Sequence, residues 1–449
     1  MMRKEFAIFA LESLIAGFYV AITRGLAPLF LTVYGMSISE ILKLNLVANA
    51  FALAAAWLLY LFRGTIISKG LKHKLVLSHA LERFIWGSIP VVAIYYPGFL
   101  YAVYTIAVVS TVPVGFTLYM AMNSTFDEDS LKRVYAYRSA LGSMSTLAGQ
   151  ATSIIVVATM EGVQKYVLLY VMAMAIGLLA SAVLASASIK SFTPAAPSEV
   201  PSGIEVAKAS TTFTYLMFLV ATGSVLGVAW TPYLVEELRA EEYIAVALGL
   251  AQTLTSVVAS VFWTTKGYAT YRYAVSLLPV VPITILYINV PMAHLAIAVL
   301  YAFANIGANL LASFTFAEVA KRFSADRASA MLTAASIPAQ VMGIGIAYVA
   351  SLYGAYMPFV TSAMLASVAL LIAFTAMPGV AVVQPQLSMM YAMQIHHTAT
   401  ALYNFVFSTV KSYATLSARL VALASSIIVL YTTFRLLYYL VQILAGAVS

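Results

Sequence analysis

Apolar residues along this chain form long, nearly continuous runs separated by short polar stretches. We predict twelve membrane-spanning helices, because each run can cross a hydrocarbon core of about 30 Å as a helix. The runs fall in two groups of six, at residues 6–33, 40–62, 76–95, 98–122, 135–158 and 166–188, and at 212–234, 243–264, 272–289, 291–318, 328–351 and 355–377. Barrel strands would instead alternate over about ten residues. The expected fold class is therefore an all-α polytopic membrane protein.

The composition supports this pattern. Of the 449 residues, 63% are hydrophobic and 9% are charged, whereas a soluble globular domain has about 25% charged residues. So few charges cannot cover a water-facing surface, which excludes a chain of soluble domains. The net charge of +8 comes from basic residues clustered between the apolar runs. That pattern is typical of membrane orientation, and we expect no nucleic-acid partner.

Motifs for catalysis and metal binding are missing from the sequence. It has no cysteine, which excludes disulfides and thiolate zinc sites. The adjacent His396 and His397 have no acidic or sulfur neighbours to complete a metal site. No nucleophile–base–acid set and no Walker-type phosphate loop is present. We expect no enzyme activity, no metal, no cofactor and no ATP-driven transport.

Basic residues indicate the orientation of the chain. One side of the predicted membrane carries Arg3, Lys4, Arg63, Lys69, Lys72, Lys74, Lys132, Arg133, Arg138, Lys190, Lys208, Lys266, Arg272, Lys321, Arg322 and Arg327. The other side carries little beyond Lys43, Lys165 and Arg239. The positive-inside rule makes the first side cytoplasmic. We expect a multi-pass protein of the plasma membrane with a cytoplasmic N-terminus.

The two groups of six runs repeat one another. Lys132-Arg133 and Arg138 return 189 residues later as Lys321-Arg322 and Arg327, and Lys69-Gly70 returns as Lys266-Gly267. Gln150 and Gln340 follow the two repeated arginines at nearly equal distances. Duplicated halves of this kind are common in transporters, which bind substrate between them near mid-membrane. We predict an N-terminal six-helix bundle at 1–189, a cytoplasmic linker at 190–211, a C-terminal six-helix bundle at 212–380 and an appendage at 381–449.

Six plus six spans, a central cytoplasmic linker and this loop pattern resemble the major facilitator superfamily over roughly residues 5–380. The family's best-known motif follows the second span, and the matching stretch here runs from Gly64 to Lys74, with Ser68 where the family has aspartate. The resemblance implies two bundles related by a pseudo-two-fold axis, which rock to give alternating access. It implies a cavity lined by the first, fourth, seventh and tenth helices. It also implies cytoplasmic gate loops, which we assign to Gly64, Ser68, Lys69, Gly70, Lys132, Arg133, Arg138, Lys266, Gly267, Lys321, Arg322 and Arg327.

Charged residues within the predicted spans are candidates for function, because they are costly there. Glu12, in the first span, is a candidate for carrying a coupling proton. The alternative is a structural ion pair of Glu12 with Arg83. Glu82 competes for the same arginine, and we predict Glu82 and Arg83 as a structural ion pair. Arg24 could grip a substrate carboxylate or phosphate in the cavity. Its alternatives are snorkelling to the outer headgroups and pairing with Glu40 or an outer-loop acid.

Uncharged polar residues give further cavity candidates. Asn305 and Asn309 lie four residues apart, so they share one helix face, which Ser313 continues. On this basis we predict a cavity lined by Asn305, Asn309, Ser313, Thr105, Thr111, Thr222 and Trp230 together with Arg24. Gln252 is isolated in its span, and we assign it to packing.

The tail after the twelfth run contains two weaker segments. We predict an interfacial helix near 388–412, because Gln394, His396, His397 and Asn404 make it a poor spanner. A thirteenth span is predicted near 418–446, where Arg435 would need a partner. A re-entrant or wholly interfacial tail is the alternative.

These features favour a secondary-active transporter that moves a small solute across the lipid bilayer, coupled to a proton or another gradient. One alternative is a flippase-like transporter of a lipid-linked substrate. Another is a scaffold or sensor that keeps the fold without transport. The sequence leaves the substrate, the direction of transport, the coupling ion and the oligomeric state open.

Overall fold

The structure, a computed structural model, describes residues 2–61, 70–189, 203–320, 325–377 and 379–401. Within these ranges the regular structure is helical and no strand is present. The first half contains α1 (Met2–Thr23), α2 (Ala27–Val33), α3 (Ile38–Leu61), α5 (Leu71–Tyr95), α6 (Leu100–Thr125), α7 (Glu128–Thr159) and α8 (Gln164–Ala185). The second half contains α9 (Gly203–Glu236), α10 (Glu242–Thr264), α11 (Tyr271–Leu277), α12 (Val280–Tyr287), α13 (Ala293–Ala320), α14 (Ala325–Ser351) and α15 (Met357–Ala376). The all-α prediction is confirmed.

Two of the predicted runs are broken helices. The run at 6–33 divides into α1 and α2, with a turn at residues 24–26 and Pro28 in the first turn of α2. The run at 272–289 divides into α11 and α12 beside Pro279. Proline lacks an N–H donor and clashes with the preceding turn, so it is favoured where a helix begins again.

Two other helices begin seven or more residues earlier than the apolar pattern predicts. The helix α7 begins at Glu128 instead of about 135, because the carboxylate of Asp127 accepts a hydrogen bond of 2.8 Å from the Ser130 N–H and caps the helix. Hydrogen bonds from the side chain and the backbone N–H of Ser130 lower the pKa of Asp127. The helix α9 begins at Gly203, so residues 203–211, which we expected in the linker, are helical.

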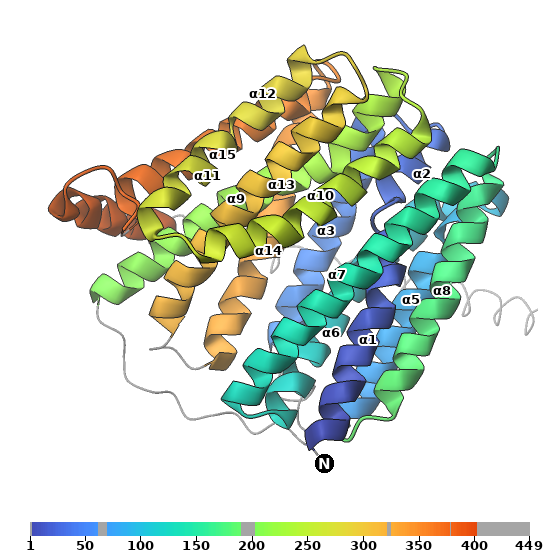
Figure 1. Cartoon of the computed structure of the whole chain (residues 1–449), viewed down its shortest axis with the longest axis horizontal. Coiled ribbons are helices and arrows are strands. Elements are labelled where there is room, and N and C mark those ends of the chain that lie inside the picture. The colour runs from blue at the N-terminus through green and yellow to red at the C-terminus, as the bar shows by residue number, and fades with distance from the viewer. Residues whose placement is uncertain (1, 62–69, 190–202, 321–324, 378, 402–449) are drawn as a thin grey trace, which may run out of the picture. The chain divides into compact units, whose positions relative to one another are not determined.

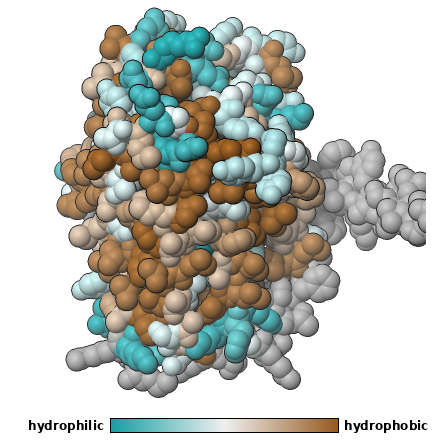
Figure 2. All heavy atoms as spheres, turned by 90° about the vertical axis from the view of Figure 1, so that its right-hand side faces the viewer, coloured by the Kyte–Doolittle hydropathy of each residue, from teal (hydrophilic) through white to brown (hydrophobic). Residues whose placement is uncertain are grey.

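The surface is that of a multi-pass membrane protein. Eleven helical segments of the described chain are long and apolar enough to span a membrane, and Ser336–Ser351 within α14 is a shorter apolar helix. Large apolar side chains such as Phe51, Phe84, Val258 and Leu371 are exposed, which is rare over wide areas of soluble proteins. Figure 2 shows one face on which hydrophobic residues form a broad zone between hydrophilic residues at the two ends.

The helices pack in two groups that correspond to the two halves of the sequence (Figure 1). In the first group α1 packs on α7 and α8, α5 packs on α6 and α8, and α3 packs on α6. In the second group α9 packs on α14 and α15, and α13 packs on α10 and α11. The main contacts between the groups are α3 on α14, α7 on α10 and α2 on α9. These contacts bring the two halves of the chain together, so that both halves can contribute residues to one site.

A close approach of α1 and α7 in the first group depends on a pair of glycines. A Cβ atom at Gly17 of α1 would overlap the backbone carbonyl oxygen of Gly142 on α7. Around this crossing the hydroxyl of Ser13 donates to the Arg138 carbonyl oxygen at 2.8 Å. Small residues allow such backbone contact between membrane helices.

We expect Gly17→Ala to destabilise the protein by about 1–3 kcal/mol, because the added methyl group forces the two backbones apart. The measurement is the thermal unfolding temperature of the detergent-solubilised protein. Gly115→Ala on α6 is the control, since a Cβ atom there would meet nothing within 4 Å. Equal unfolding temperatures for the two variants would contradict the packing role of Gly17.

The tail belongs partly to a second unit, residues 393–449, of which residues 393–401 are described. Residues 385–401 are helical, which overlaps the interfacial helix expected at 388–412. The predicted thirteenth span at 418–446 lies outside the described residues.

Candidate functional site

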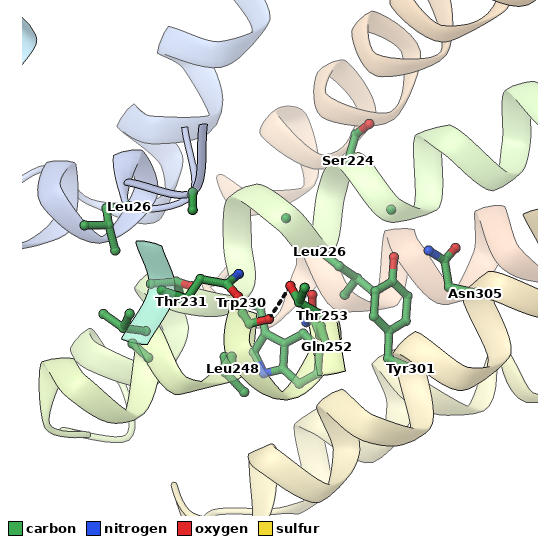
Figure 3. Close-up of a pocket in the computed structure, with 18 of the residues that line it drawn as sticks. Leu26, Ser224, Leu226, Trp230, Thr231, Leu248, Gln252, Thr253, Tyr301 and Asn305 are labelled. Atoms are coloured by element: carbon green, nitrogen blue, oxygen red, sulfur yellow. Dashed lines mark hydrogen bonds between the residues drawn. The ribbon is translucent and has the colours of Figure 1, made fainter. Parts of the chain in front are cut away.

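A cavity of about 660 Å³ lies between the two groups of helices (Figure 3). It is lined by α1 and the turn after it, by α7 from the first group, and by α9, α10, α13 and α14 from the second group. This volume is within the range of pockets that hold small molecules, about 300–1,000 Å³. The cavity is therefore the leading candidate for a binding site.

The polar groups that face this cavity are all uncharged. The lining residues with polar side chains are Gln150, Ser224, Trp230, Thr231, Gln252, Thr253, Tyr301, Asn305, Asn309 and Gln340. Amides and hydroxyls both donate and accept hydrogen bonds. No acidic or basic side chain is among the described residues that line the cavity, so a charged ligand would meet no counter-charge. The lining is suited to a neutral solute with several hydrogen-bonding groups.

The two asparagines of α13 are arranged in order along one face. The Asn309 Nδ2 group donates to the Asn305 backbone oxygen at 2.8 Å and to Asn305 Oδ1 at 3.0 Å. This orientation leaves Nδ2 of Asn305 and Oδ1 of Asn309 as a donor and an acceptor for a solute.

Two aromatic residues border the same space. Trp230 of α9 meets Tyr301 of α13 edge to face, with ring centroids 6.2 Å apart (Figure 3). Trp230 donates its indole N–H to Nδ1 of His294 at 3.0 Å, and Nε2 of His294 lies 2.7 Å from the Ile288 carbonyl oxygen. This chain of hydrogen bonds fixes the indole plane at the cavity wall.

Of the eight residues predicted from sequence, Trp230, Asn305 and Asn309 line the cavity. Thr105 and Thr111 lie on α6, which does not border it. Thr222 is buried and donates to the Phe218 carbonyl oxygen at 2.8 Å, and Ser313 is exposed beyond the cavity. The eighth residue, Arg24, is engaged elsewhere, as described below.

The sequence prediction did not include three glutamines that line the cavity. Gln252 lines it from α10, although we assigned that residue to packing. Gln150 and Gln340 line it from α7 and α14. Gln150 and Gln340 occupy matching positions in the two repeats, and this could have indicated that both line the same cavity.

A second polar site, the charged network, lies inside the first group of helices. It consists of Glu12 on α1, Arg24 after α1, His79, Glu82 and Arg83 on α5, and Arg138 on α7. Arg24 Nη2 lies 2.5 Å from Glu82 Oε1, and Arg83 pairs with the other oxygen of Glu82. Glu12 pairs with Arg138. The side chains of Glu12, His79, Glu82 and Arg83 are at most 4% exposed.

His79 connects the two ion-pair clusters. Its Nε2 lies 3.1 Å from Glu12 Oε1 and 2.8 Å from Arg83 Nη2, and its Nδ1 lies 2.8 Å from the hydroxyl of Ser181. One ring nitrogen cannot accept from the guanidinium and donate to the carboxylate at the same time. The position of the proton on His79 therefore decides whether Nε2 accepts a hydrogen bond from Arg83 or donates one to Glu12.

The predicted structural ion pair of Glu82 and Arg83 is present, but other pairings considered from sequence are wrong. Glu12 pairs with Arg138 and His79 and not with Arg83, because Arg83 turns to its neighbour Glu82. Arg24 reaches Glu82 instead of a membrane headgroup or Glu40. Glu40 accepts from Ser37 at 2.9 Å. The Arg24 side chain keeps 36% exposure, but the residue is not part of the cavity lining.

Several residues of the predicted gate loops, Gly64, Ser68, Lys69, Lys321 and Arg322, lie outside the described residues, as does the side chain of Arg327 on α14. Gly70 precedes α5 with φ 71°, a conformation that glycine adopts without strain. Lys132 lies 3.8 Å from Asp129, and Arg133 donates to the Asp129 carbonyl oxygen at 3.4 Å. Lys266, which precedes Gly267, covers the ring of Phe262 at 4.6 Å. Arg138 belongs to the charged network.

One further ion pair joins the two groups of helices. The ammonium group of Lys165 on α8 lies 2.9 Å from Oε2 of Glu242 on α10, and the Tyr166 hydroxyl donates to the same oxygen at 2.5 Å. The Lys165 side chain is 7% exposed. A desolvated pair with a second hydrogen bond fixes one end of α8 against one end of α10.

Comparisons with known proteins identify the fold. No family model matches the sequence, and no curated protein matches it either. A D-xylose–proton symporter matches the structure with a TM-score of 0.62 and 13% identity, over 84% of this chain and 98% of that chain. A variant of the nucleoside transporter NupG matches with a TM-score of 0.61 and 12% identity, over 81% and 98%. An inward-facing bacterial homologue of the iron transporter ferroportin matches with a TM-score of 0.58 and 12% identity, over 83% of this chain and 98% of that chain.

Proposed function

We propose that this chain is a secondary transporter that moves a small neutral solute by alternating access. The observation that carries the proposal is the cavity between the two groups of helices, which receives uncharged polar side chains from both. The major facilitator fold supports it, because its solved examples include a D-xylose–proton symporter and the nucleoside transporter NupG. At 12–13% identity these matches support the architecture and leave the solute to be argued from the cavity.

The moving parts in this proposal are the bundle at 1–189 and the bundle that begins with α9 at Gly203, connected by the segment that precedes α9. The pairing of α8 and α10 through Lys165 and Glu242 would hold one side of the cavity closed. Opening that side requires the ion pair to separate and the Lys165 ammonium and Glu242 carboxylate to be hydrated. The N-terminus is proposed to lie in the cytoplasm of a plasma-membrane protein, because the basic loops lie on that side.

The charged network is the proposed coupling site, with Glu12 as the proton carrier. His79 supports this role, because its Nε2 can pass a proton to Glu12 Oε1 over 3.1 Å. Three arginines face two glutamates in the network. A proton entering or leaving changes a charge balance that the surrounding apolar helices cannot screen.

The test is uptake into proteoliposomes of radiolabelled D-xylose, uridine, succinate and choline, which cover neutral, anionic and cationic solutes. We expect a neutral solute to be taken up and the ions to be excluded. In Asn309→Leu the uptake rate should fall about tenfold, because losing a hydrogen bond to the solute costs about 1.4 kcal/mol. Ser313→Ala, one turn along α13, is the control.

Uptake limited to the charged solutes would contradict the proposal. Movement of a fluorescent lipid-linked sugar between leaflets, with no uptake of any soluble solute, would favour the flippase-like alternative. Failure of both assays in folded protein would favour the scaffold or sensor.

A further inference from the structure

An amide oxygen of a cavity-lining residue has no hydrogen-bond partner within the part of the chain that the structure describes. Gln150 lines the cavity from α7, and its Oε1 is buried without a partner among the described residues. Four other buried side-chain atoms share this state, in Glu5, Arg24, Arg83 and Trp86, and none of those residues lines the cavity. A buried acceptor without a donor costs free energy. The Oε1 atom is therefore a buried acceptor without a donor among the described residues, on a side chain that lines the cavity.

The amide group of Gln150 lies against a glycine of the opposite group of helices. A Cβ atom at Gly249 on α10 would lie 3.0 Å from Nε2 of Gln150. The carbonyl oxygen of Gly249 already accepts from the Thr253 hydroxyl at 3.0 Å, so that hydroxyl proton is not donated to Oε1 of Gln150. Gly249 and Thr253 both line the cavity. A larger residue at position 249 would push the amide away from this wall.

The other half of the chain supplies a matching amide. Gln340 lines the same cavity from α14, and it follows Arg327 much as Gln150 follows Arg138. The cavity thus has one repeat-related glutamine from each half. A solute bound to both would connect the two groups of helices.

We propose that Gln150 determines which solute is accepted, by taking a hydrogen bond from a hydroxyl or N–H group of a neutral solute onto Oε1. This inference rests on the proposed function. An analogue without that donor would leave the buried oxygen unpaired in the bound state, and sites of this kind reject such analogues strongly. Carboxylates have no donor for the oxygen and would meet no counter-charge in the lining.

The first measurement needs no knowledge of the solute. In Gln150→Met the side chain keeps nearly the same length and loses the unpaired oxygen. The ligand-free variant in detergent should unfold at a temperature a few degrees above that of the wild type. Gln164→Met, at the exposed start of α8, is the matched control and should leave the unfolding temperature unchanged.

The second measurement is competition of uptake by deoxy analogues, with D-xylose and uridine as probes. In the wild type, one deoxy analogue of the transported probe should bind at least about tenfold more weakly than the parent. In Gln150→Met that difference should disappear, with KM for the parent rising to the value for the analogue. Gly249→Ala keeps the amide but displaces it, so it should weaken the same discrimination.

A lowered unfolding temperature for Gln150→Met would overturn the inference, because it would mean that the amide makes a hydrogen bond that stabilises the ligand-free fold. Retention of the wild-type discrimination in that variant would overturn it as well. Absence of uptake for every neutral probe would count against the proposed function, while the unfolding comparison would still decide whether Oε1 is an open acceptor.

Discussion

Replacing Glu82 with glutamine is expected to cause a large loss of stability. The Glu82 carboxylate is fully buried and accepts from both Arg24 and Arg83. A glutamine leaves two guanidinium groups without a counter-charge among the helices of the first group. Removing one partner of a buried ion pair typically costs about 3–5 kcal/mol. The measurements are the yield of monodisperse protein and its thermal unfolding temperature.

The matched control is Glu40→Gln, because Glu40 is exposed at the start of α3 and bonds to Ser37. That variant should resemble the wild type in yield and unfolding temperature. Glu82→Asp, which keeps the charge on a shorter side chain, should lie between the two. If Glu82→Gln unfolded at the wild-type temperature, the network would not depend on this carboxylate.

Replacing Glu12 with glutamine is expected to remove the response of uptake to a pH gradient while solute exchange continues. Glutamine cannot titrate, and it can still accept from Arg138 or His79. The measurement is uptake with and without an imposed pH gradient, alongside counterflow exchange at equal pH. Counterflow should remain within about twofold of the wild type, because the cavity lining does not include Glu12.

Glu161→Gln, in the exposed turn between α7 and α8, is the control for Glu12→Gln and should keep the gradient response. A gradient response that survives in Glu12→Gln would exclude Glu12 as the proton carrier. Loss of both uptake and counterflow would assign Glu12 to the assembly of the first group of helices instead.

Much of the fold could be predicted from sequence, because the length of an apolar run is local information. The helix breaks at residues 24–26 and at Pro279 were harder to predict from sequence, since a proline in an apolar run can either kink a helix or end it. The start of α7 at Glu128 also had a wider effect. It places Arg138 about three turns inside the helix, where it can reach Glu12, although the loop pattern suggested a residue at the membrane surface.

The candidate site could be predicted only in part. Asn305 and Asn309 share a face because of helical spacing, and the sequence contains that information. The partner of a buried charge depends on which helices meet. Arg24 and Glu82 are 58 residues apart, and no local rule connects them. Gln150 and Gln340 were visible as repeat positions, but only the helix arrangement relates those positions to a cavity.

The indole of Trp230 gives the cavity its own optical reporter. It lines the cavity and is hydrogen-bonded to His294, so a solute that enters changes the polarity around a fluorophore held in one orientation. The other three tryptophans, Trp57, Trp86 and Trp263, do not line the cavity. With those three replaced by phenylalanine, the emission spectrum would come from one indole at the cavity wall. Occupancy could then be followed in real time without any label on the solute.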